Sequence, residues 1–145
     1  MTTTTPFSDL THAIEDRFRA RITAGGDGGD AITTVFSGDP NDGPSSGLWC
    51  RITIASAGRT QQDIGASSIR SRTTGAVIVE CYGPAITGTS TLLALADRVG
   101  KCFERYVGSG LTFRTPEIPG GTTPTRFGSW SRINVSCPFV FDDLS

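Results

Sequence analysis

The residues that could support catalysis are few, and the best match lies in a short glycine-rich segment. Gly43-Pro44-Ser45-Ser46-Gly47 fits the G-x-S-x-G pattern of a hydrolase, in which a strand precedes the serine and a helix follows it. Here we expect a loop before the serine and a strand after it. His12 is the only histidine and precedes the serine, whereas that enzyme class places its histidine last. The segment is better explained as a Gly/Ser turn, so we predict no catalytic residue.

Metal and nucleotide sites also lack their full residue sets. Residues 25–33 fit the calcium-binding nonapeptide once, whereas that motif binds ions between stacked copies. The cysteines are 31, 21 and 35 residues apart, without the close pairs or neighbouring histidines of a zinc site. Gly100-Lys101 lacks the upstream glycine of a phosphate-binding loop. We therefore predict no metal and no cofactor. The four cysteines are expected to be reduced core thiols: Cys50, Cys81, Cys102 and Cys137.

Length and charge limit the class of protein. The chain has 145 residues, which suits one domain spanning residues 1–145. Its 13 basic and 14 acidic side chains give a net charge of −1, so it lacks the basic surface of a protein that grips DNA phosphates. No apolar run approaches the roughly 20 residues of a membrane helix, and the N-terminus lacks the pattern of a secretory signal. We expect a cytosolic chain with no membrane partner.

Hydrophobic periodicity predicts two helices and a sheet. Apolar residues recur at helical spacing from Phe7 to Ile22 and again from Leu92 to Tyr106. Alternating apolar and polar residues predict strands between and after these helices. The expected fold class is α+β, a mostly antiparallel sheet with two helices packed on one face. The expected strands are 31–36, 48–57, 72–82, 111–118 and 133–141.

Polar segments separate or follow these strands. Gly58 to Ser71 is polar and broken by glycine, and it predicts a long β-hairpin arm that projects from the sheet. Pro119 to Gly128 is expected to be a loop, and Asp142-Asp143 is expected to lie in a tail. Long loops on small domains are often functional, so the arm is the first candidate for a contact surface.

The phase of the strands separates two kinds of side chain. The three strand cysteines share the phase of the aliphatic residues, so we expect them to face the helices. Trp49 and Trp130 share the phase of Arg51 and Arg132, and should lie on the opposite face. Tryptophan and arginine are enriched at interface hot spots, which favours a protein contact there. The alternative is a β-bulge that returns each tryptophan to the core.

The order and spacing of these segments resemble the phage tail terminator family. The resemblance runs from about Phe7 to Phe141 and rests on segment order, because no catalytic signature is present. It begins with the amphipathic N-terminal helix. The other matching segments are Leu48–Ile54, a Gln-Gln/Gly arm, Arg72–Pro84, Gly88–Val99 with Phe103, Leu111–Ile118 and Trp130–Phe141.

The resemblance implies a structural virion protein of long-tailed phages or gene transfer agents, and not an enzyme. In that family a ring, expected to be a hexamer, caps the end of the tail tube, stops its polymerisation and joins it to the head connector. The implied partners are other copies of the chain, the tail tube protein and the head-side connector or adaptor protein. DNA is expected to pass through the lumen without specific binding. The implied location is the head-proximal end of the virion tail, after assembly in the host cytoplasm.

The arm and the second face of the sheet are the predicted contact surfaces for a neighbouring subunit or the tube. A head–tail connector or tail-completion protein is the main alternative. A small-ligand-binding domain or enzyme is a further alternative, and would need a pocket with converging polar groups around Asp97, Arg98 or the Gly/Asp loop (Gly25–Asp30). The predicted interface residues are Arg59, Gln61, Gln62, Arg70, Arg72, Trp49, Arg51, Trp130 and Arg132.

Overall fold

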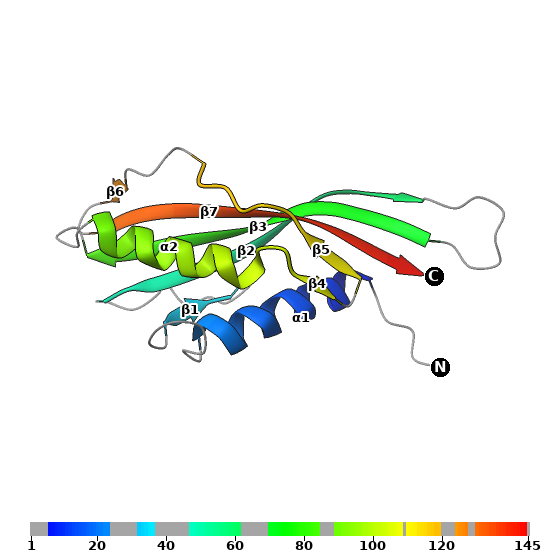
Figure 1. Cartoon of the computed structure of the whole chain (residues 1–145), viewed down its shortest axis with the longest axis horizontal. Coiled ribbons are helices and arrows are strands. Elements are labelled where there is room, and N and C mark those ends of the chain that lie inside the picture. Colours follow the sequence, from blue (N-terminus) through cyan, green and yellow to red (C-terminus); the bar gives the residue numbers. More distant parts are fainter. Residues whose placement is uncertain are drawn as a thin grey trace.

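A computed structural model describes residues 6–23, 32–36, 47–61, 70–84, 89–108, 110–119, 124–127 and 130–144. Within these residues the fold is α+β, with two α-helices and a curled, mostly antiparallel sheet (Figure 1). Gln62, the whole Gly/Asp loop (Gly25–Asp30) and residues 43–46 of the serine motif lie outside the described residues. The helices are α1 (Pro6–Phe18), followed by a π-helical turn (Arg19–Thr23), and α2 (Thr89–Phe103). The strands are β1 (Thr33–Val35), β2 (Trp49–Gln61), β3 (Arg70–Pro84), β4 (Val107–Gly108), β5 (Leu111–Phe113), β6 (Thr125–Phe127) and β7 (Trp130–Leu144).

Both helices form where the apolar spacing predicts them. In α1 and its π-helical extension, the side chains at intervals of four residues are fully buried: Leu10, Ile14, Phe18 and Ile22. At the end of α2, the Arg17 Nε donates a hydrogen bond to the carbonyl oxygen of Cys102 at 2.6 Å. The Arg17 guanidinium also lies 3.7 Å from the centre of the Tyr106 ring. Arg17 thus ties α1 to a carbonyl in the last turn of α2.

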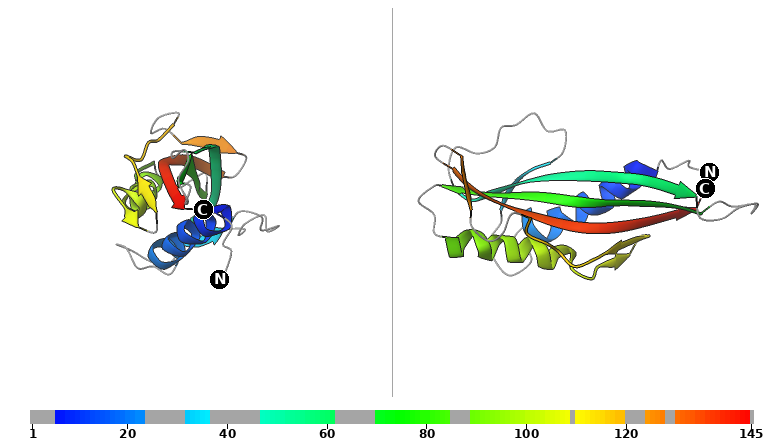
Figure 2. Two further views of the ribbon diagram at one scale, coloured as in Figure 1. Left: turned by 90° about the vertical axis from the view of Figure 1, so that its right-hand side faces the viewer. Right: turned by 90° about the horizontal axis from the view of Figure 1, so that it is seen from above.

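The sheet has the strand order β1-β2-β3-β7-β5-β4, and β6 also pairs with β7. Among the strands of the described residues, β1 alone runs parallel to its neighbour, which is β2. The long strands β2, β3 and β7 lie side by side along the length of the molecule (Figure 2). On its outer edge β2 pairs with β1 only from Trp49 to Arg51, and beyond Arg51 this edge meets no other strand within the described residues.

The projecting arm is built from three strands. β2 and β3 stay paired as far as Gln61 and Ser71, and β7 continues beside β3 until Leu144 pairs with Arg70. The predicted strand ends at residues 57 and 72 were therefore too short, and the expectation of a tail at Asp142-Asp143 was wrong. Side-chain alternation fades in these polar segments, but strand pairing still satisfies the backbone hydrogen bonds.

Two further predictions on the C-terminal half need correction. The strand expected over 111–118 ends at Phe113, and only Glu117 makes a later bridge, to Ser136 of β7. Pro116 lacks a backbone donor and interrupts the ladder between them. The loop expected over 119–128 contains β6, a short strand that pairs with the beginning of β7.

The core lies between the helices and one face of the sheet. All four cysteines are buried in it as free thiols, as predicted. Burial raises the pKa of the Cys137 thiol from 9.0 to about 12. Phe18 stacks on Phe103 with 6.1 Å between ring centres, and Phe103 stacks on Phe113 at 4.8 Å. These aromatic pairs join α1, α2 and β5.

Candidate functional site

The face of the sheet opposite the helices carries a cluster of aromatic and charged side chains, here called the aromatic–arginine face. Cys50 and Cys81 pair in register and point into the core, so their neighbours Trp49 and Tyr82 point to the other side. Tyr82 pairs in turn with Arg132 of β7, which places three strands in one row. The aromatic–arginine face consists of Trp49, Arg51, Glu80, Tyr82, Trp130, Arg132 and Asn134.

The two tryptophans pack together on this face. Trp49 is only 4% exposed and stacks on Tyr82, with ring centres 4.2 Å apart and planes within 9°. Trp130 is half-buried and meets Trp49 edge to face, at 6.1 Å and 83°. Strand pairing is regular through both positions, and the register shift in β2 lies further on, between Ser56 and Gly58. The prediction that both tryptophans lie opposite the helices is confirmed, and the bulge alternative is wrong.

Tyr82 connects the charged groups of the face. Its hydroxyl donates a short hydrogen bond to the Glu80 carboxylate, and the Arg132 guanidinium hydrogen-bonds to the same tyrosine. Burial and then the Glu80 carboxylate raise the pKa of Tyr82, while Arg132 opposes this shift. Because Glu80 turns to Tyr82, it forms no ion pair with Arg51, although the two residues are direct cross-strand partners.

Three buried polar atoms of this face have no hydrogen-bond partner in the structure: Trp49 Nε1, Arg51 Nε and Asn134 Oδ1. They come from one end of the sheet, since Arg51, Glu80 and Asn134 form the row next to Trp49, Tyr82 and Arg132. Each buried unpaired group costs about 1–3 kcal/mol. The guanidinium carbon of Arg51 lies 5.7 Å from the centre of the Trp49 ring. The face therefore holds a cation that is not neutralised by the described residues around it.

The predicted arm residues lie at the opposite end of the same strands. Arg59 pairs with Thr73 and Gln61 with Ser71, while Arg70 begins β3 opposite Leu144. Arg72 is exposed and makes a bidentate ion pair with Asp142, with distances of 2.8 and 3.1 Å. This pair raises the pKa of Arg72. The structure thus divides the predicted interface residues into two groups, one at each end of the long strands (Figure 1).

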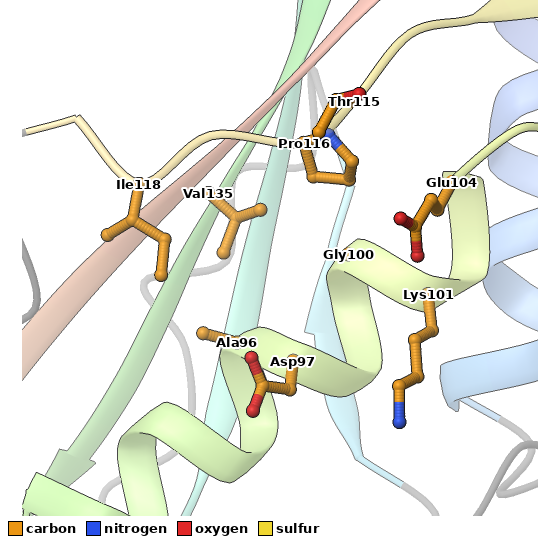
Figure 3. A pocket seen from close by; sticks show the side chains of 9 residues that line it. All are labelled: Ala96, Asp97, Gly100, Lys101, Glu104, Thr115, Pro116, Ile118 and Val135. Carbon is orange, nitrogen blue, oxygen red and sulfur yellow. The ribbon is translucent and has the colours of Figure 1, made fainter.

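A small cavity opens on the helix side of the molecule, between α2 and the segment after β5. Its volume is about 210 Å³, and Val135 of β7 lies at its base (Figure 3). Gly100 lies beside Pro116 in the lining, and a Cβ there would make an ordinary van der Waals contact with the Pro116 side chain at 3.5 Å. The other lining residues are Ala96, Asp97, Lys101, Glu104, Thr115 and Ile118.

The cavity lies where a ligand-binding domain would need it, near Asp97. Ligand pockets typically have volumes of about 300–1,000 Å³ and a few polar groups that converge inside. Here Asp97, Lys101 and Glu104 are all exposed at the rim, and no ion pair joins them. In Figure 3 the Lys101 ammonium points away from the Glu104 carboxylate. The floor is apolar, which suits the side chain of another protein better than a polar small molecule.

Sequence reasoning missed several residues of these two surfaces. Tyr82, Glu80 and Asn134 have the same strand phase as the tryptophans and arginines, so the phase pattern could have identified them. No sequence pattern predicts the cavity, because α2 and the segment around Pro116 are brought together only by folding. Among the residues that the structure describes, no group of three His, Cys, Asp or Glu side chains could hold a metal ion. No described helix is long and apolar enough to cross a membrane.

Comparisons with known proteins support the fold and carry no information on function. No protein-family model matches the chain, and no curated protein matches its sequence. A solved structure of unstated function matches with a TM-score of 0.61 and 16% sequence identity, covering 88% of this chain and 92% of that chain. The match over nearly the full length of both chains shows that this α+β arrangement also occurs in an experimentally determined protein.

Proposed function

We propose that this chain is a structural virion protein that forms a ring on the end of a phage tail tube. The ring stops tube polymerisation and provides the surface that joins the head-side connector. The observation that carries the proposal is the aromatic–arginine face, where Trp49, Trp130 and an unpaired Arg51 lie on the side of the sheet that neither helix covers. This composition is typical of a protein interface rather than of a solvated sheet.

The arm supports the same proposal. Three strands extend it beyond the part of the sheet that packs on α2, so its backbone is paired before any partner binds. An arm of this kind provides a second contact surface at the other end of the molecule from the tryptophans (Figure 1). A ring subunit contacts its neighbours and also the tube or the connector, and two separate surfaces allow both kinds of contact.

The test is to measure the mass of the purified protein by light scattering, alone and after mixing with purified tail tubes, and to examine the mixture by electron microscopy. We expect rings, or a monomer that becomes a ring at one tube end and halts further growth. A second mixture, with purified head-side connectors, tests the alternative: a chain that binds these connectors and ignores tube ends would instead be a connector or tail-completion protein. A chain that stays monomeric in both mixtures would contradict the whole class of ring-forming proteins.

A further inference from the structure

We infer that the subunits of this ring bind head to tail, with the aromatic–arginine face of one copy seated on the α2 cavity of the next. The inference rests on the proposed function, because it names the partner of that face as a second copy of this chain. Each copy would then use one surface for each neighbour, as a heterologous interface requires.

The two surfaces are placed so that one copy can use both at once. The aromatic–arginine face lies on the side of the sheet that carries Asn134, whereas the cavity is lined by Val135 and by α2 on the other side. Successive residues of a strand point to opposite faces, so the two surfaces look in different directions. Repeating this contact gives a closed ring when the rotation from one copy to the next divides a full turn into equal parts.

The charges of the two surfaces are complementary. The aromatic–arginine face has two cations, Arg51 and Arg132, and one anion, Glu80, which gives a net charge of +1. The cavity rim has two exposed carboxylates, Asp97 and Glu104, and one exposed ammonium, which gives −1. Opposite charges across an interface direct the encounter and select the orientation of the partners.

Arg51 is the strongest single reason for this pairing. Its direct cross-strand partner, Glu80, is held by Tyr82, and its Nε has no hydrogen-bond acceptor. Asp97 and Glu104 make no ion pair with the described residues around them. Pairing one of these carboxylates with Arg51 would satisfy charged groups on both copies, provided that the Arg51 side chain turns to expose its Nε.

The cavity provides a seat for the exposed edge of Trp130. An apolar cavity of about 150 Å³ is enough to hold a benzene ring, and the α2 cavity measures about 210 Å³. Trp49 is already buried against Tyr82, so the half-exposed Trp130 is the indole available to a neighbour. Ala96, Pro116 and Ile118 supply apolar contacts for it.

The test reverses the charges one surface at a time. Arg51→Glu breaks the aromatic–arginine face, and Asp97→Lys with Glu104→Lys breaks the cavity rim. Particle mass is measured by light scattering, with tail tubes added if the wild-type ring forms only on tubes. We expect each altered chain to lose the ring. An equimolar mixture of the two should recover the ring with the two chains in alternation, because the two unaltered surfaces pair with each other and the two reversed surfaces pair with each other. A chain carrying all three reversals should regain the ring.

Matched controls separate assembly from folding. Asp16→Lys in α1 and Arg19→Glu in the π-helical turn that follows it reverse exposed charges outside both surfaces, and should keep the ring. Arg51→Gln removes the charge with less disturbance, and should raise the protein concentration needed for ring formation while the thermal midpoint stays constant. Rings formed by either charge-reversed chain, or no recovery in the triple variant, would overturn the head-to-tail pairing and leave the terminator proposal standing. A wild-type chain that never assembles, even on tubes, would overturn both.

Discussion

The unpaired indole nitrogen of Trp49 predicts that phenylalanine is almost as good at this position as tryptophan. The side chain is 4% exposed, stacks on Tyr82 at 4.2 Å and buries an N–H that has no acceptor. Trp49→Phe keeps an aromatic ring on Tyr82 and removes the N–H. Trp49→Ala removes the stacking as well, and serves as the matched control.

The magnitudes follow from the two opposing effects. Removing an unsatisfied buried donor should recover about 1–3 kcal/mol of unfolding free energy. Losing two ring carbons from a buried site should cost roughly 1.5 kcal/mol, at about 0.8 kcal/mol per buried carbon group. We therefore expect Trp49→Phe to change the unfolding free energy by no more than about 1.5 kcal/mol in either direction. Trp49→Ala should lower it by about 3–5 kcal/mol.

Urea unfolding followed by circular dichroism gives both values. The chain has two tryptophans, so Trp49→Phe also leaves Trp130 as the sole indole fluorophore and allows the transition to be followed on this face. A Trp49→Phe protein that loses as much stability as Trp49→Ala would refute the reasoning. That result would mean that the indole N–H has a hydrogen-bond acceptor in solution.

Three further predictions concern the turn before β5, the core thiols and the arm. Gly110 has φ +83°, and a Cβ there would lie 2.5 Å from the Asp142 carbonyl oxygen, so Gly110→Ala should lower the unfolding free energy by more than about 1 kcal/mol. Gly47→Ala, with the same φ but open space, should cost less in the same urea titration. Because the folded pKa of Cys137 is about 12 and the ordinary value is 9.0, its contribution to stability is complete below pH 9 and is lost as the pH rises toward 12. Ionisation of Cys137 should therefore lower the unfolding free energy by about 1.4 kcal/mol per pH unit across this range. The fall with pH should be smaller in the Cys137→Val variant. Arg72→Ala should leave the monomer's thermal midpoint nearly unchanged and weaken assembly with tubes, because its ion pair with Asp142 is exposed; a large fall in the midpoint would place Arg72 among the residues that hold the fold.

The elements with strong periodicity were predictable from the sequence. The buried positions of α1 recur every four residues, and strand phase correctly separated the core cysteines from Trp49 and Trp130. These patterns are local, because a helix or strand shows its buried face in its own spacing. The elements that depend on a partner were not predictable in this way. The strand at Thr125–Phe127 is paired by β7, and the polar ends of the arm are held by neighbouring backbones.

The same distinction between local patterns and partner-dependent features applies to the two candidate surfaces. The aromatic–arginine face follows from alternation along single strands, so strand phase predicted four of its seven members, and the other three share that phase. The unpaired state of Arg51 could not be predicted, because it depends on the hydrogen bond from Tyr82 to Glu80. The α2 cavity likewise depends on how closely Pro116 approaches Gly100.

The outer edge of β2 has a consequence for solubility. Beyond Arg51 this edge meets no strand within the described residues, and a long flat edge is a template on which any other chain can pair and aggregate. The register shift between Ser56 and Gly58 leaves Ala57 unpaired and twists the strand at this point. The single additional residue in the ladder thus protects an exposed edge against indiscriminate strand addition.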